Sequence, residues 1–242
     1  MYYAVLSDIH GNLKALERVI ADLESYEIQG VIILGDLIDY GTRSNEVIDL
    51  IRNALEHKIC CNIWGNHEQA IICADYRRFS TERGVKCAQY TSTVLNVNSM
   101  DYIQNMMDNN GMRTMMCDHT RILAVHGSLN DCFWGSITPE DVDGDYRDYD
   151  IVFSGHSHKS HMFSKLYDAD DPLRRNKHKV LFINPGSVGQ PRNHNCNAQY
   201  VLLDLENMEV VFRSIPYDIE GAMREFDGSV DLFYRDRLRF GI

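Results

Sequence analysis

The chain has 242 residues, of which 44% are hydrophobic and 24% charged, and its formal net charge is −11. These values are ordinary for a soluble globular protein and allow one large α/β domain with a sizeable core. The acidic balance argues against a nucleic-acid-binding module, which needs a basic face to neutralise phosphates. A small phosphorylated ligand remains open, because bound metal ions can reverse the local sign of the field.

The sequence gives no sign of export or of a membrane span. The N-terminus lacks a basic segment and reaches a charge at Asp8, and no apolar stretch approaches the ~18 residues that a membrane-spanning helix needs. Seven cysteines, an odd number without a CxxC pair, argue against a disulfide framework. We therefore expect a cytoplasmic protein that does not associate with membranes.

Short apolar runs alternate with helical patterns in the first quarter of the chain. The runs 2–7, 31–34 and 58–64 predict buried strands, and Asn12 is a plausible N-cap for the first helix. A second helix is predicted over 45–55, where the apolar residues share one side. Strands that alternate with helices predict a parallel sheet with right-handed crossovers.

The remaining segments complete a mixed α/β pattern. Residues 67–110 read as mostly helical, and Thr138-Pro139 resembles a helix start with Pro at the first helical position. Further strands are predicted over 112–117 and 121–125, paired around a turn at Asp118-His119, and over 151–154, 180–183, 200–205 and 209–213. Without repeats or linkers, residues 1–242 are expected to form a single domain, with a partly helical C-terminal extension, 215–242, packed on it.

Polar residues follow the predicted strands at the points where the strands end. In an open α/β sheet the carboxyl ends of the strands meet at one edge, where ligands bind. Five separated segments therefore bring two Asp, one Asn and five His to one edge: Asp8, His10, Asp36, Asn66, His67, His126, His156 and His158.

Imidazole and carboxylate groups together suit borderline divalent ions such as Mn, Fe, Zn, Ni or Co. Taken singly, each group has an ordinary structural explanation: Asp8 could cap a helix, and His126 could be a hydrogen-bonded core histidine. All five segments occur in order, however, each after an apolar run, so coincidence is a poor explanation. The ligands suffice for two ions that share a bridging carboxylate, roughly 3.5–4 Å apart as in two-metal hydrolases.

The full set of motifs resembles that of the calcineurin-like metallophosphoesterases. The likeness extends to the compact prokaryotic phosphodiesterase branch, the relatives of diadenosine tetraphosphatase and Ser/Thr phosphatases, and it covers nearly the whole chain. The motifs are Asp8-x-His10, Gly35-Asp36-x-x-Asp39, Gly65-Asn66-His67-Glu68, His126-Gly127-Ser128, Gly155-His156-x-His158 and Asn184-Pro185-Gly186-Ser187.

The resemblance implies a four-layer α/β (α+β) sandwich of two mixed β-sheets flanked by helices. It implies that Asp36 bridges two divalent metal ions (Mn, Fe, Zn, Ni or Co) and that His67 is the catalytic histidine near the leaving group. One ion would be held by Asp8, His10, Asp36 and His158, and the other by Asp36, Asn66, His126 and His156. The implied activity is hydrolysis of small phosphodiesters or nucleotides, through attack by a metal-bridged hydroxide.

Several alternatives stay open. A Ser/Thr protein phosphatase or a dinucleoside polyphosphate hydrolase would use the same site, and a non-catalytic scaffold of this fold would have lost it. Arg192 is a candidate phosphate contact, Asp39 is expected to orient its loop, and a nucleotide-sized pocket could be lined by Tyr40, Trp64, Phe133 and Trp134. The sequence leaves open the native substrate, the native metal, the oligomeric state (a homo-oligomer included) and the roles of the 166–179 insertion and the C-terminal extension.

Overall fold

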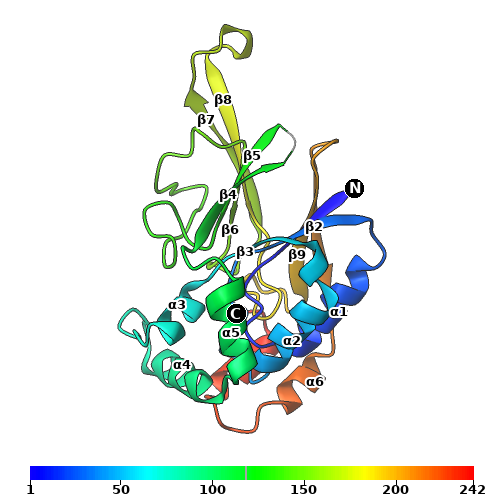
Figure 1. The fold of residues 1–242 in the computed structure, drawn as a ribbon, viewed down its shortest axis with the longest axis vertical. Coiled ribbons are helices and arrows are strands. Elements are labelled where there is room, and N and C mark those ends of the chain that lie inside the picture. Colours follow the sequence, from blue (N-terminus) through cyan, green and yellow to red (C-terminus); the bar gives the residue numbers. More distant parts are fainter. Residues whose placement is uncertain (118) are drawn as a thin grey trace.

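The computed structural model describes residues 1–117 and 119–242, so Asp118, half of the predicted turn, lies outside the described residues. Two mixed five-stranded sheets pack face to face, and the described chain contributes seven α-helices around them (Figure 1). The predicted fold class, two mixed sheets flanked by helices, is confirmed.

The first sheet has the strand order β10-β9-β1-β2-β3. Strands β1, β2 and β3 run parallel, as the alternation of strands and helices predicts, and β9 and β10 add an antiparallel edge. The strand bounds are Tyr2–Leu6 for β1, Ile28–Ile33 for β2, Ile59–Asn62 for β3, Ala198–Asp204 for β9 and Glu209–Ile215 for β10.

The second sheet has the order β4-β5-β6-β8-β7, with a parallel centre of β5, β6 and β8. The hairpin β7–β8 extends far beyond the body of the molecule, as the tip at the top of Figure 1 shows. The strand bounds are Met112–Cys117 for β4, Thr120–Val125 for β5, Ile151–Ser154 for β6, His161–Asp168 for β7 and Lys177–Asn184 for β8.

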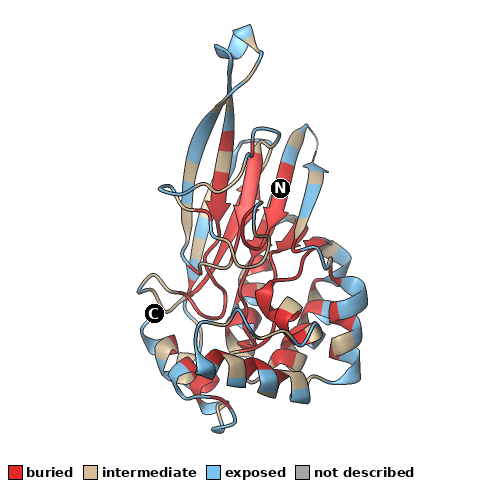
Figure 2. Cartoon of the chain, turned by 90° about the vertical axis from the view of Figure 1, so that its left-hand side faces the viewer, coloured by how far each residue is buried: buried red, intermediate tan, exposed pale blue. Residues whose placement is uncertain are grey.

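The hydrophobic core fills the space between the sheets and beneath the helices (Figure 2). Ile32 and Val201 of the first sheet meet Ala124 and Phe153 of the second in the inner layer. On the outer face of the first sheet lie α1, Leu13–Leu23, which is capped by the side chain of Asn12 as predicted, and α2, Ser44–Ala54. The helical middle of the chain forms α3, Asn66–Ile72, α4, Glu82–Val94, and α5, Val97–Met106.

The outer face of the second sheet is covered by an irregular segment. Ile137 and Tyr146 pack with Phe182 in a cluster of their own. The predicted helix at Thr138-Pro139 is therefore wrong: Asp141 N–H donates to the Thr138 side chain and closes a single turn, and the backbone then leaves helical geometry.

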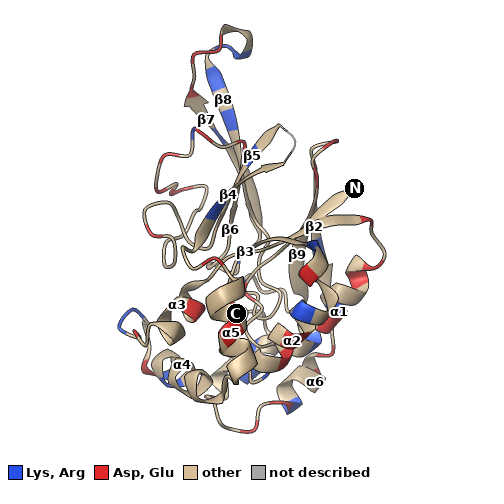
Figure 3. Ribbon diagram, in the orientation of Figure 1, with Lys and Arg blue, Asp and Glu red and all other residues tan. Residues whose placement is uncertain are grey.

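Two peripheral segments complete the structure. The tip of the β7–β8 hairpin contains a 3-10 turn, Pro172–Arg174, and exposed basic residues that include Arg174, Arg175 and Lys177 (Figure 3). The C-terminal segment forms α6, Ile219–Arg224, α7, Phe233–Asp236, and a 3-10 turn, Arg237–Arg239. Helix α6 contacts α1, and Tyr40 stacks on Tyr234 at 4.5 Å, which places this segment beside the loop that follows β2.

Candidate metal centre

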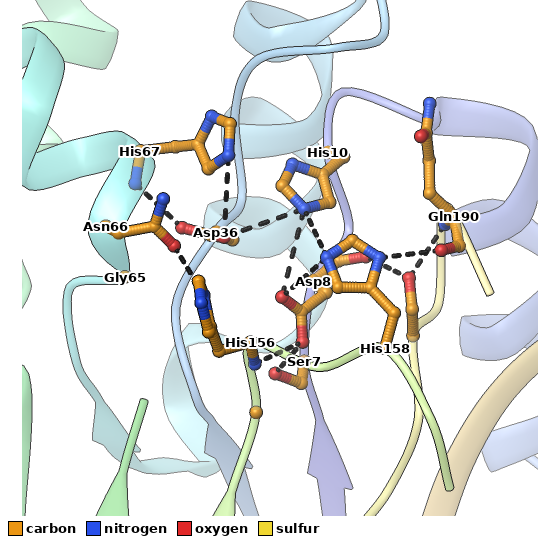
Figure 4. A network of polar contacts seen from close by, with 12 residues as sticks. Ser7, Asp8, His10, Asp36, Gly65, Asn66, His67, His156, His158 and Gln190 are labelled. Atoms are coloured by element: carbon orange, nitrogen blue, oxygen red, sulfur yellow. Dashed lines mark hydrogen bonds and ion pairs between the residues drawn. The ribbon is translucent and has the colours of Figure 1, made fainter. Parts of the chain in front are cut away.

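The loops that leave β1, β2, β3, β5 and β6 converge at one edge of the paired sheets, and they carry the predicted metal ligands and His67; Figure 4 labels all of these residues except His126. Arg192 lies in the segment between β8 and β9. Several of these residues hold a left-handed backbone that side chains with a Cβ rarely adopt, with φ of 54° at Asp8, 49° at His10, 54° at Asp36, 63° at His156 and 57° at His158. Such strained residues cluster at functional sites, where the surrounding structure enforces them.

The first group consists of Asp8, His10, Asp36 and His158, all buried. Each offers one ligand atom, and the four atoms lie within 4.8 Å of one another. Nε2 of His10 lies 3.1 Å from Nε2 of His158, and Nε2 of His158 lies 3.2 Å from Oδ1 of Asp8. Oδ1 of Asp8 and Oδ2 of Asp36 are buried without a hydrogen-bond partner, although their other oxygens accept N–H or O–H donors.

The second group adjoins the first through Asp36. Nε2 of His126 lies 3.4 Å from Oδ2 of Asp36. Oδ1 of Asn66 lies 3.0 Å from that same nitrogen and 2.9 Å from Nδ1 of His156. The free oxygen of Asp36 therefore lies between the two groups.

Backbone carbonyls fix which imidazole nitrogen faces the site. Nδ1 lies 3.2 Å from the Ile38 carbonyl in His10, 2.6 Å from the Leu34 carbonyl in His126 and 2.6 Å from the Gln190 carbonyl in His158. A carbonyl can only accept, so each Nδ1 carries a proton and each Nε2 points inward. This is the arrangement by which metal-binding histidines are oriented in proteins.

The charge balance of the site suits a cation. Burial disfavours the ionised form of the carboxyl groups, but the His158 and His126 imidazoles outweigh it and hold the pKa of Asp8 and Asp36 below their usual range. Burial lowers the pKa of His156 to about 3 and that of His10 well below its ordinary value, whereas Asp36 and Asp8 outweigh burial at His126 and raise its pKa to about 9. His126 would therefore release a proton when its Nε2 binds a cation. Ionised carboxylates and neutral imidazoles are the forms that bind metals.

Glu68 holds the Asp36 loop in place. Its Oε2 accepts the backbone N–H groups of Asp36 and Gly65, each at 2.8 Å, and its Oε1 accepts that of Leu37 at 2.7 Å. Glu68 belongs to the Gly65-Asn66-His67-Glu68 motif, but the motif alone predicts no role for its side chain. The signal available was its position three residues after Gly65, the capping-box spacing at the start of α3.

His67 faces the same cavity beside the two ligand groups, with its Nε2 3.9 Å from Oδ2 of Asp36. Its Nδ1 lies 2.6 Å from Oδ2 of Asp39, and Thr91 donates to the other Asp39 oxygen at 2.8 Å. Burial lowers the pKa of His67, but the charges of Asp36 and Asp39 outweigh it, so the pKa is raised. The sequence predicts that Asp39 orients its own loop; in the structure its carboxylate contacts His67 and Thr91, which lie in α3 and α4.

The site opens into a cavity of ≈ 280 Å³ lined by Asp36, Tyr40, Asn66, His67, Arg78, Phe79, Ser80, Trp134, His156, His158 and Arg192. Of the four aromatic residues considered from the sequence, Tyr40 and Trp134 line it. Trp64 is buried and donates to the Ile103 carbonyl, and the half-buried Phe133 packs against Gly111 and the core, so neither lines the cavity. Phe79 and Arg78 were missed because nothing in their local sequence marks them.

Arg192 lines the cavity without a carboxylate partner among the described residues, and its Nε is buried without a hydrogen bond. Arg78, in contrast, is paired with Asp131 at 2.5 Å. The unpaired carboxylate oxygens, the inward-facing imidazoles and the amide oxygen of Asn66 form a donor set that fits a borderline divalent cation.

Comparison with known proteins agrees with this chemistry. The model of the calcineurin-like phosphoesterase superfamily domain matches residues 1–208, and the chain belongs to this superfamily. An uncharacterized protein of Methanocaldococcus jannaschii is 28% identical over 226 residues, which cover 90% of this chain and 89% of that protein.

Two solved structures share the fold over the whole chain. A metallophosphoesterase from Sphaerobacter thermophilus is 25% identical, with a TM-score of 0.72 and coverage of 100% of this chain and 99% of that one. A hypothetical protein from Pyrococcus horikoshii is 22% identical, with a TM-score of 0.82 and coverage of 100% and 98%. Among the described residues, no helix combines the length and the apolar character needed to cross a bilayer.

Proposed function

We propose that the protein is a dinuclear-metal-dependent phosphodiesterase that hydrolyses small phosphodiesters or nucleotides. The observation that carries this proposal is the pair of buried carboxylate oxygens without partners, on Asp8 and Asp36, which face inward-pointing imidazole nitrogens. An unpaired buried charge is costly, and bound cations remove that cost.

The two ligand groups would each hold one ion, with Asp36 shared between them. The first ion is assigned to Asp8, His10, Asp36 and His158, and the second to Asp36, Asn66, His126 and His156. When bound, a metal pair polarises phosphoryl oxygens and lowers the pKa of water. Mn, Fe, Zn, Ni and Co all suit these ligands.

The other residues of the cavity position the substrate and move the proton. Arg192 is placed to donate hydrogen bonds to a phosphate oxygen, because its guanidinium has no competing carboxylate. His67, with Nδ1 held by Asp39, can give the proton on Nε2 to the departing oxygen as a general acid. The small cavity favours a small substrate over a folded phosphoprotein.

The test is a panel of phosphoesters assayed with each metal added back to metal-free protein. The panel contains aryl phosphodiesters, phosphopeptides and dinucleoside polyphosphates. Diester hydrolysis that exceeds turnover of the other two classes supports the proposal. Faster turnover of phosphopeptides would show instead that the protein is a protein phosphatase, and faster turnover of dinucleotides that it is a dinucleoside polyphosphate hydrolase. If no substrate is turned over with any metal, the protein is a non-catalytic scaffold.

We further propose that residues 1–242 act as one domain in the cytoplasm. In support, all seven cysteines are free, as suits a reducing compartment. In addition, the C-terminal segment contacts the rest of the chain through α1 and the Tyr40–Tyr234 stack.

A further inference from the structure

One wall of the cavity is aromatic. Phe79 precedes α4 and Trp134 belongs to the loop after β5, so the two rings come from separate parts of the chain. Their centroids lie 5.3 Å apart with the planes at 89°, both residues are half-buried, and both line the cavity. Edge-to-face pairs of this kind form stable apolar surfaces.

Trp134 is held by polar contacts rather than by the core. It takes part in none of the hydrophobic clusters that the described residues form. The guanidinium of Arg78 lies 5.3 Å from its ring centroid and is fixed by two contacts to Asp131, at 2.5 and 3.2 Å. The indole N–H donates to Gln69 at 3.4 Å. A large ring fixed in place yet open to the cavity suits ligand contact.

The aromatic wall formed by Phe79 and Trp134 lies next to His67, the proposed general acid. The Phe79 ring lies 5.1 Å from the His67 ring, and the Trp134 ring lies 6.1 Å from that of His156. A general acid must be close to the oxygen that it protonates. The aromatic wall is therefore on the side of the cavity where the leaving group departs.

We propose that Phe79 and Trp134 form a subsite for an aromatic ring carried by the leaving group of the substrate, an inference that rests on the proposed phosphodiesterase function. In the reaction, the oxygen of water bonds to phosphorus and the bond from phosphorus to the arylalkyl oxygen breaks. His67 gives its proton to the departing alcohol, and a proton released by the attacking water returns His67 to its protonated form. The cavity volume allows one ring beside the phosphate.

The direction of cleavage of a mixed diester tests the subsite. In methyl 2-phenylethyl phosphate both substituents are primary alcohols of similar chemical reactivity, so the ratio of 2-phenylethanol to methanol reports how the substrate binds. We expect 2-phenylethanol to exceed methanol by about tenfold or more, because ring burial and aromatic contact favour one orientation. The 2-cyclohexylethyl analogue should give a smaller ratio.

Variants assign the effect to the two rings. Trp134→Leu and Phe79→Leu should each lower the product ratio by about three- to tenfold. Phe240→Leu is the matched control, because Phe240 is an exposed aromatic that does not line the cavity, and it should keep the wild-type ratio. A wild-type ratio near one, or a Trp134→Leu ratio equal to that of the wild type, would overturn the subsite.

A binding measurement separates this inference from the proposed function. Titration calorimetry of manganese-loaded protein compares 2-phenylethylphosphonate with 2-cyclohexylethylphosphonate, neither of which is hydrolysed. Tighter binding of the phenyl compound that is lost in Trp134→Leu supports the subsite even if no diester is cleaved, in which case only the proposed function fails. Equal binding of both compounds, together with diester cleavage, would overturn the subsite alone.

Discussion

Nδ1 of His67 lies 2.6 Å from Oδ2 of Asp39, and because a carboxylate can only accept, His67 donates this hydrogen bond. The bond fixes the ring so that Nε2 faces the cavity, 3.9 Å from Oδ2 of Asp36. Asp39 is itself held by the Thr91 hydroxyl at 2.8 Å. This chain of contacts presents a proton donor beside the ligand groups and raises the pKa of that donor, which is the state a general acid needs.

Replacing His67 should slow hydrolysis without loss of metal. A positioned general acid contributes about 10²–10⁴-fold to rate, so His67→Gln should reduce turnover by roughly that factor. The loss should shrink for nitrophenolate, a leaving group that needs little protonation. Kinetics on one good and one poor leaving group, measured beside metal content, check this. Equal losses for both leaving groups would argue against acid catalysis, and a lost metal would make His67 a ligand.

Replacing Asp39 should act through His67. Asp39→Asn keeps the size of the side chain but weakens the hold on Nδ1, so it should forfeit part, about 10-fold or more, of the 10²–10⁴-fold that a positioned general acid contributes. We expect a loss of that order for poor leaving groups and almost none in a His67→Gln background. Additive losses in the double variant, obtained from the same two-substrate kinetics, would show that Asp39 acts independently of His67.

Replacing Glu68 should loosen the Asp36 loop. In Glu68→Gln the amide N–H₂ replaces either Oε2, which accepts from Asp36 and Gly65, or Oε1, which accepts from Leu37 and Ile38, so it faces two backbone N–H groups in either case. Unsatisfied buried donors cost about 1–3 kcal/mol each. We expect a lower free energy of unfolding and weaker metal binding, measured by denaturation and metal titration. Glu56→Gln, at an exposed position, is the control and should change neither quantity. An unchanged metal affinity in Glu68→Gln would show that Glu68 does not position the Asp36 loop for metal binding.

Much of the fold, and the convergence of the predicted ligands at one edge, could be predicted because each of these residues follows a buried strand. Strands β1, β2 and β3 are apolar runs, and the parallel order that they imply brings Asp8, Asp36 and Asn66 to one edge. The helix start at Asn12 could be predicted because a short polar side chain precedes apolar residues at helical spacing. The structure confirms it, since the Ala15 N–H donates to Oδ1 of Asn12.

The features that were missed depend on tertiary contacts. Strand β7 is largely exposed and pairs only with β8 in the projecting hairpin, so its sequence lacks a buried run. The turn at Thr138-Pro139 has helix-start chemistry, but the segment must cover the outer face of the second sheet and leaves helical geometry. Arg78 and Phe79 are brought beside Trp134 only by the folded loops, which sequence spacing does not encode.

Replacing Arg192 should weaken substrate binding and leave the metals in place. Charge-assisted hydrogen bonds are worth about 1.5–3 kcal/mol, so Arg192→Gln should lower kcat/KM by about 10–100-fold for diesters. Arg175→Gln in the exposed hairpin tip makes the same charge change far from the cavity and serves as the control. The same kcat/KM for both variants would exclude a phosphate contact by Arg192.

The metal content of wild-type and Asp36→Asn protein, measured by elemental analysis after saturation with Mn²⁺ and removal of free ion, is the most direct test of the proposed dinuclear site. Oδ2 of Asp36 is buried without a partner and lies 3.6 Å from Nε2 of His10 and 3.4 Å from Nε2 of His126, between the two ligand groups. We therefore expect two ions per wild-type chain and a weakening of both in Asp36→Asn. A wild-type chain that binds only one ion at saturation, or an Asp36→Asn variant that keeps two ions with unchanged affinity, would contradict a bridging role for Asp36.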